Sequence, residues 1–245
     1  MEESTALAAR EAPAAAPTDR CSAPEERAPV IRTLTELVLE RRMRAARALL
    51  EQRLQEGIPV EGVLNGYLAP AARRLGSLWD ADRVTFTDVT VSVGRLQDLQ
   101  RELDPLLMPS CWPLNAPRAL LATVPGDQHA FGVSMAAALL HKRGWQVSGV
   151  PSNREADLIS AARTGWFEVI GLSLTCDHHL ETIHPLVARL RDASLNREVR
   201  ITLGGLIAIS RPEEVRGQCA AGDEVTIVDS VEALAALEET PPGAN

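Results

Sequence analysis

Residues 118–132, RALLATVPGDQHAFG, join a short apolar run to a polar loop. The run ends at Pro125-Gly126 and predicts a buried strand of a parallel sheet. The loop places Asp127 and His129 directly beyond the end of that strand. Because ligands of parallel sheets bind outside the carboxyl ends of the strands, this stretch predicts both the fold and the position of a binding site.

Strand and helix patterns alternate from here to the end of the domain, over residues 118–240. We expect strands at 118–124, 145–150, 167–174, 199–203 and 225–228, with helices at 133–143, 154–164, 180–193, 212–220 and 231–237. Five strands alternating with five helices imply a flavodoxin-like, Rossmann-like parallel sheet that is covered by helices on both faces.

Residues 30–108 carry apolar side chains at helical spacing instead. We expect amphipathic helices at 34–50, 63–68, 75–79 and 86–103, the last with Asp88 as its N-terminal cap. Four such helices joined by short turns predict a helical bundle that precedes the α/β domain. Residues 109–117 contain three prolines and are predicted to be a linker.

The composition bounds the remaining possibilities. Residues 1–29 are rich in Ala, Pro, Glu and Arg and are predicted to be a disordered tail. A formal net charge of -8 disfavours unaided binding to DNA phosphates but leaves a DNA-binding partner open. The four cysteines form no CxxC pair, and neither a signal peptide nor a bilayer-spanning apolar stretch is recognisable, so we expect a cytoplasmic protein with reduced thiols.

The candidate site residues follow the ends of four predicted strands and should gather at one edge of the sheet. They are Gly126, Asp127, Gln128, His129, Ala130, Phe131 and Gly132 after the first strand, Ser173, Leu174, Thr175, Asp177 and His179 after the third, Gly204 and Gly205 after the fourth, and Asp229 after the fifth.

Each residue type has a chemical use in this position. The imidazole of His129 can bind a metal ion, while Asp127 accepts a hydrogen bond from the other ring nitrogen and fixes the tautomer. Gly126 and Gly132 allow tight turns, and the two later glycines remove side chains where a bulky group approaches. Taken singly, such residues more often form turns, cap helices or are polar residues on the surface. Their order along consecutive strand ends favours a ligand site. The adjacent His178 and His179 are expected to point to different sides of a helix, which disfavours a metal pair.

The order Asp127-x-His129-x-x-Gly132, Ser173-Leu174-Thr175 and Gly204-Gly205 resembles the cobalamin-binding domain of methionine synthase, corrinoid methyltransferases and cobalamin photoreceptors. This resemblance implies a base-off, His-on cobalamin with His129 as the lower axial ligand of cobalt. It also implies a slot for the nucleotide tail near Ser173, Thr175, His179 and the glycine pair. The middle motif is Ser-Leu-Thr rather than Ser-x-Leu, which leaves the tail contacts open.

The helical segment extends the resemblance. Photoreceptor members carry a bundle Trp followed by a Glu-His pair, and here Trp79 matches while Val89-Thr90 occupies the Glu-His position. An upper histidine ligand is therefore not implied. The stretch 79–97, which includes Phe86, resembles the AerR/PpaA group of cobalamin-binding regulators of photopigment genes. That resemblance implies a light-responsive antirepressor of a CrtJ/PpsR-type DNA-binding repressor, not an enzyme, with Trp79, Phe86, Val89 and Thr90 above the corrin.

Two alternatives stay open at this point. The chain could be a corrinoid carrier subunit that serves a separate methyltransferase, because the same His-on fold is used there. It could also be a haem sensor with His129 on iron, although the complete Asp-x-His-x-x-Gly motif favours cobalamin. The form of cobalamin (adenosyl-, methyl- or hydroxocobalamin), the upper ligand and self-association are not determined by the sequence.

Overall fold

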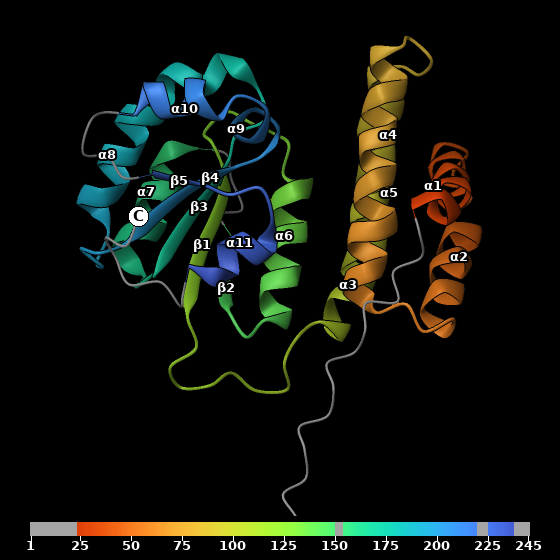
Figure 1. Cartoon of the computed structure of the whole chain (residues 1–245), viewed down its shortest axis with the longest axis horizontal. Coiled ribbons are helices and arrows are strands. Elements are labelled where there is room, and N and C mark those ends of the chain that lie inside the picture. The colour runs from red at the N-terminus through yellow and green to blue at the C-terminus, as the bar shows by residue number, and fades with distance from the viewer. Residues whose placement is uncertain (1–23, 150–153, 220–224, 238–245) are drawn as a thin grey trace, which may run out of the picture.

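A helical segment precedes a five-stranded parallel sheet in the computed structural model, which describes residues 24–149, 154–219 and 225–237 (Figure 1). This arrangement confirms the predicted fold class. The disordered tail predicted for 1–29 extended too far, because helix α1 begins at Pro24; residues 1–23 lie outside the described residues. Among the residues that the structure describes, no helix is both long and apolar enough to cross a bilayer.

The helical segment is built from α-helices with one π-helical and one 3-10 turn. Its elements are α1 (Pro24–Leu39), α2 (Met43–Gln55), α3 (Val60–Val63), the π turn η1 (Leu64–Leu68), α4 (Ala69–Asp80), α5 (Phe86–Leu103) and the 3-10 turn η2 (Asp104–Leu106). Residues 109–117, all of which the structure describes, contain neither helix nor strand, as expected for a linker.

The helix predicted over 34–50 is two helices. Arg41 has a φ of 62°, in the left-handed region that ends a helix, so α1 stops at Leu39 and α2 begins at Met43. The apolar stripe continues across this break because Leu34, Leu37, Ala46 and Leu50 are all buried in the same core. Periodicity therefore predicted the buried face correctly but not the interruption.

The two short helices predicted at 63–68 and 75–79 form one continuous helical run instead. Pro70 lies near the start of α4, where it has no N–H to donate and its ring would clash with the carbonyl four residues earlier. The π turn η1 immediately precedes it and contains Gly66, the residue at that position. A π turn changes the local hydrogen-bond pattern and lets the run pass through the proline without a break.

Helix α5 begins with a capping box. The hydroxyl of Thr85 accepts a hydrogen bond from the Asp88 amide at 3.1 Å, and the Asp88 carboxylate accepts one from the Thr85 amide at 3.0 Å. The cap is therefore Thr85, and Asp88, which was expected to be the cap, is the third residue of the helix. This box fixes the entry of α5 next to the aromatic residue Phe86.

The α/β part alternates as predicted, with one additional short helix. Its elements are β1 (Arg118–Thr123), α6 (Phe131–Lys142), β2 (Gln146–Gly149), α7 (Glu155–Thr164), β3 (Val169–Ser173), the 3-10 helix η3 (Asp177–Thr182), α8 (Ile183–Ala193), β4 (Arg200–Gly204), α9 (Leu206–Ser210), α10 (Pro212–Gln218), β5 (Val225–Ile227) and α11 (Val231–Ala236). Helix α9 was not expected, because the helix predicted after the fourth strand begins only at residue 212.

The strands lie in the order β2-β1-β3-β4-β5 and all neighbours pair in parallel. This is the flavodoxin-like order, whose ligand position lies where the chain switches direction between β1 and β3. The register aligns Thr123 with Ser173, and Ser173 with Gly204. Three predicted strand ends therefore meet in one row at the carboxyl edge of the sheet.

Helix α6 belongs to two hydrophobic cores. Leu140 packs with sheet residues such as Leu121, whereas Met135, Ala138 and Leu139 pack with the buried side chains of the bundle. Figure 1 shows α6 between the sheet and α5. The bundle is thus attached to the α/β part through a helix that begins in the candidate site loop.

Candidate functional site

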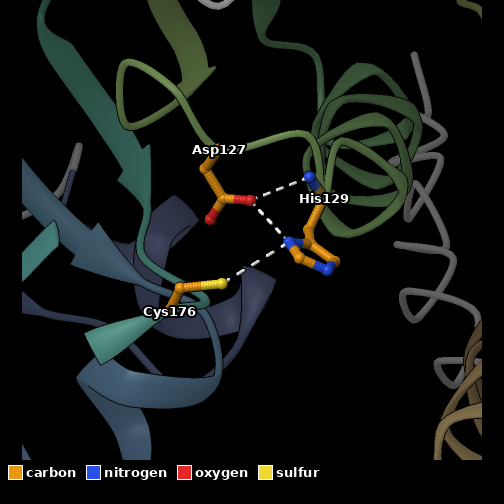
Figure 2. Close-up of side chains that lie close together, drawn as sticks. All are labelled: Asp127, His129 and Cys176. Atoms are coloured by element: carbon orange, nitrogen blue, oxygen red, sulfur yellow. Dashed lines mark hydrogen bonds and ion pairs between the residues drawn. The ribbon is translucent and has the colours of Figure 1, made fainter. Parts of the chain in front are cut away.

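Asp127 is the organising residue of the site (Figure 2). Its side chain is fully buried and accepts hydrogen bonds from two segments. Oδ1 accepts from the His129 amide at 2.9 Å and from the His129 ring Nδ1 at 2.6 Å, and Oδ2 accepts from the Thr175 amide at 3.2 Å. One carboxylate therefore holds the loop after β1 against the loop after β3.

The hydrogen bonds decide the charge of Asp127. Burial by itself would raise the pKa of this carboxyl group, but the donors from His129 and Thr175 outweigh burial and lower the pKa below its ordinary value. Asp127 is therefore ionised in the folded protein. An ionised carboxylate can only accept, so the ring nitrogen Nδ1 of His129 carries a proton.

His129 presents its other ring nitrogen to solvent. The side chain is 61% exposed, and in Figure 2 Nε2 lies on the side of the ring away from Asp127 and Cys176. With the proton on Nδ1, Nε2 of the neutral ring has a free lone pair. This is the arrangement of a metal-binding histidine that is backed by a carboxylate, and the predicted hydrogen bond between Asp127 and His129 is confirmed.

Gly205 adopts a conformation that other residues rarely adopt, with φ 91° and ψ 175°. A Cβ there would lie 2.7 Å from the Leu174 carbonyl oxygen, and 2.9 Å from both the Leu174 nitrogen and Ser173 Oγ. At Gly204 a Cβ would meet the Val228 carbonyl oxygen at 3.3 Å. The glycine pair therefore lets β3, β4 and the segment after β5 approach closely at the sheet edge.

The two glycines of the first loop differ from each other. Gly126 has a φ of 89°, and a Cβ there would lie 3.2 Å from the Cε1 atom of His179, so its turn was predicted correctly. Gly132 does not form a turn, because α6 already begins at Phe131. Among the described residues, no atom lies within 4 Å of a Cβ built on Gly132.

His179 is buried and contacts His178, with ring centroids 3.9 Å apart and the ring planes tilted by 46°. The expectation that these rings point apart was wrong, since the two rings of the 3-10 helix η3 contact each other. Burial, followed by the neighbouring His178, lowers the pKa of His179, so the ring is neutral. Its Nε2 has no hydrogen-bond partner among the described residues, which leaves a polar atom available to a ligand.

The other predicted site residues are placed as follows. Phe131 packs against the bundle core, and Val89 does the same from α5. Leu174 is fully buried, and its backbone bonds Gly204 and Ile207. Five more predicted residues are exposed: Thr90, Gln128, Ala130, Asp177 and Asp229. The Thr90 hydroxyl donates to the Phe86 carbonyl, and Asp177 forms an ion pair with Arg211 at 3.8 Å. Asp229 accepts a hydrogen bond from the Ser230 hydroxyl.

Trp79 and Phe86 form an exposed aromatic pair where α4 ends and α5 begins. Their ring centroids are 6.1 Å apart in an edge-on arrangement, and the residues are 48% and 68% exposed. Figure 1 shows the α4–α5 turn at the same end of the molecule as the loops beyond the carboxyl edge of the sheet. Adjacent exposed apolar side chains of this kind form a candidate contact surface.

Sequence reasoning missed two features of the site. Cys176 Sγ lies 3.9 Å from Nδ1 of His129, and the available signal was its position directly after Thr175 at the end of β3. On α9, Leu206 and Ile209 are exposed beside the glycine pair. The apolar residues that follow Gly204-Gly205 in the sequence could have indicated the exposed apolar surface formed by Leu206 and Ile209.

A flavodoxin-like sheet that carries a carboxylate-backed, solvent-facing histidine, together with a helical bundle, is the architecture of a corrinoid-binding protein. Residues 117–238 match the B12 binding domain family, and residues 30–97 match a second B12 binding domain family. A Rhodobacter capsulatus protein, described as an uncharacterized 20.5 kDa protein in the bchF-crtJ intergenic region, is 32% identical over 157 residues, which are 64% of this chain and 81% of the relative. The chain therefore belongs to the B12-binding family, as a cobalamin-binding protein of the AerR type.

The fold also resembles a solved structure. The Methanosarcina barkeri monomethylamine corrinoid protein superimposes with a TM-score of 0.67 at 18% identity, covering 89% of this chain and all of that one (100%). At this identity the likeness establishes the fold alone.

The residues at the sheet edge fit a cobalamin. His129 offers a free Nε2 for cobalt, His179 offers an unpartnered buried nitrogen, and Gly205 has no side chain where the ends of β3 and β4 pack closely. A bulky corrinoid with a long polar tail needs all three: a metal ligand, polar partners and close backbone approach.

The lowered pKa of Asp127 makes a prediction about acid stability. The folded protein binds this proton less readily than the unfolded chain, so the stabilisation is complete above the unfolded pKa of about 3.9 and is lost as the pH falls through the lower folded pKa. Asp127→Asn should therefore be less stable than wild type at pH 7, and the difference should shrink below about pH 4. Urea denaturation at several pH values measures this, with the exposed Asp98→Asn as control. A difference that stays constant into acid would contradict the linkage.

Proposed function

We propose that the protein is a cobalamin-dependent, light-responsive regulator of transcription, and not an enzyme. It would act as an antirepressor on a DNA-binding repressor of the CrtJ/PpsR type that controls photosynthesis and tetrapyrrole genes. The main observation in support is the exposed pair Trp79 and Phe86 at the end of the bundle that lies toward the site edge. The genomic origin of the Rhodobacter capsulatus relative, between bchF and crtJ, also supports this function.

The chain's own residues would hold the cofactor from two sides. His129 would bind cobalt from below through Nε2, while Ser173, His179 and the glycine pair would hold the tail at the sheet edge. Trp79 and Phe86 would cover the upper face of the corrin. Bound cobalamin, whether adenosyl-, methyl- or hydroxocobalamin, would supply a light-sensitive cobalt–carbon bond or an exchangeable upper ligand.

Helix α6 offers a route from the cofactor to the bundle. It begins at Phe131, two residues after His129, and its Met135, Ala138 and Leu139 lie in the bundle core. The Ser134 hydroxyl donates to Oε1 of the buried Gln100 on α5 at 2.7 Å. A shift of the His129 loop would therefore be transmitted to α5. Such a shift would alter partner binding if the partner binds one bundle position better than the other.

The charge of the chain supports a protein partner. With a formal net charge of -8, the protein would be repelled by DNA phosphates, so reading DNA would fall to the repressor. The aromatic pair offers an apolar surface that such a partner could bind once the cofactor no longer covers it.

The test is to load the purified protein with each of the three cobalamins and record visible spectra and repressor affinity in the dark and after illumination. We expect light to change both, and Trp79→Ala to retain cobalamin but lose the light-dependent change in repressor affinity. Trp166→Ala is the matched control, because Trp166 is equally exposed at 49% but lies in the α/β part. Methyl transfer from bound methylcobalamin to a thiol, with no effect of light on repressor affinity, would favour the carrier function instead. Uptake of haem and of no cobalamin would favour the haem sensor.

A further inference from the structure

The side chains of Asp127 and Cys176 meet the ring of His129 on the side opposite to Nε2 (Figure 2). Asp127, His129 and Cys176 each offer one potential ligand atom, and these oxygen, nitrogen and sulfur atoms all lie within 4.8 Å of one another. Asp127 is buried, Cys176 is half-buried and His129 is exposed. The cluster joins the loops after β1 and β3, and the proposed light response uses no part of Cys176.

The distances suit a tetrahedral metal ion. Bonds from zinc are about 2.3 Å to sulfur and about 2.0–2.2 Å to nitrogen and oxygen. The 3.9 Å between Cys176 Sγ and His129 Nδ1 is shorter than those two bonds placed end to end, so one ion can reach both atoms. In a tetrahedral zinc site the ligand nitrogen and oxygen lie about 3.4 Å apart. The 2.6 Å between Nδ1 and Asp127 Oδ1 must therefore open by about 0.8 Å, which rotation of the exposed His129 ring permits. Water can fill the fourth position.

The donor set selects the kind of metal. A thiolate and an imidazole favour zinc and similar transition metals, whereas magnesium and calcium require mainly oxygen ligands. The Thr175 amide holds the second oxygen of Asp127 at 3.2 Å and keeps Oδ1 directed toward His129. The site is therefore preorganised by a second hydrogen-bonded partner, as metal ligands usually are.

We propose that Asp127, His129 and Cys176 bind a zinc ion in the cobalamin-free protein, and that zinc and His-on cobalamin exclude each other. The reason is the tautomer of His129. Cobalt needs the lone pair of Nε2, which is free while Nδ1 carries its proton toward Asp127. Zinc takes the lone pair of Nδ1, so the ring proton moves to Nε2 and cobalt can no longer be bound there. The exclusion rests on the proposed cobalamin ligation, whereas the zinc site does not.

Titration of the full-length, cobalamin-free protein with Co²⁺ tests the zinc site. We expect a near-ultraviolet thiolate-to-cobalt charge-transfer band that Zn²⁺ abolishes by displacement. Cys176→Ser should lose this band and weaken zinc binding by at least about 10- to 100-fold, the loss that even an outer partner of a metal site causes. Cys111→Ser, at an exposed free cysteine of the linker, should keep both. No band in the wild type, or a band that survives Cys176→Ser, would overturn the proposal.

Addition of hydroxocobalamin to zinc-saturated protein tests the exclusion. Zinc should reduce His-on binding in the wild type and have no effect in Cys176→Ser, whose His129 Nε2 is unchanged. Equal His-on binding by the wild type with and without zinc would overturn the exclusion. A wild type that binds Co²⁺ with the thiolate band but never takes up cobalamin would contradict the proposed function while supporting the zinc site, so the two failures are distinguishable.

Discussion

His129→Ala is expected to abolish His-on ligation of cobalamin. The bound or residual cobalamin should show the base-on spectrum of the free cofactor, because the ring that Asp127 orients toward the cofactor is removed. The affinity should fall by at least about 10- to 100-fold, since loss of an outer-shell partner alone costs that much. Visible spectroscopy and equilibrium dialysis measure the two effects.

The fold should tolerate this change. The side chain of His129 is 61% exposed, and its backbone amide still donates to Asp127 at 2.9 Å after the substitution. The melting temperature should therefore stay near that of the wild type. His184→Ala, an exposed histidine on α8, is the matched control and should retain the wild-type spectrum. If His129→Ala keeps the His-on spectrum, then another residue is the lower ligand.

Gly205→Ala is expected to be the most damaging single-methyl change at the site. The backbone at φ 91° and ψ 175° is a region essentially restricted to glycine, which alone costs about 1–3 kcal/mol for another residue. The new Cβ would lie 2.7 Å from a backbone carbonyl, and a backbone atom cannot rotate away as a side chain can. We expect a loss of stability of at least that size, together with loss of cobalamin.

The size of this effect can be judged against Gly217→Ala. Gly217 lies on the exposed side of α10, where a Cβ meets no described atom within 4 Å. Because alanine is the better helix former, this control should be neutral or more stable by up to about 1 kcal/mol. Urea denaturation compares the two variants, and equal stabilities would contradict the close packing inferred at Gly205.

The sequence predicted the strands well because apolar runs that end at glycine or proline report burial directly. The first loop was correct for the same reason: Asp127 and His129 follow a strand end, and only one residue, Gln128, separates them. The same local signals failed at Arg41, because a left-handed residue inside a continuous apolar stripe leaves no trace in the periodicity. They failed at Pro70 as well, where a π turn carries the helix past a residue that normally ends one.

Hydrophobic periodicity and local motifs could not predict the contacts between loops. Cys176 approaches His129 because the Thr175 amide bonds Asp127, 48 residues earlier in the chain. The motif could not predict the packing of Phe131, whose partly buried ring packs against a bundle core that residues far from it in sequence create. A motif identifies the residues of a loop, but the tertiary packing decides which side each of them presents.

The double membership of α6 has a consequence for building new proteins from this family. The two matched segments, 30–97 and 117–238, divide the chain by sequence, yet Met135, Ala138 and Leu139 of the second segment complete the interior of the first. An α/β part produced alone would expose this apolar strip to water and would be prone to aggregate. Chimaeras that combine the bundle of one relative with the sheet of another should therefore keep Met135, Ala138 and Leu139 of α6 matched to the bundle whose interior they complete.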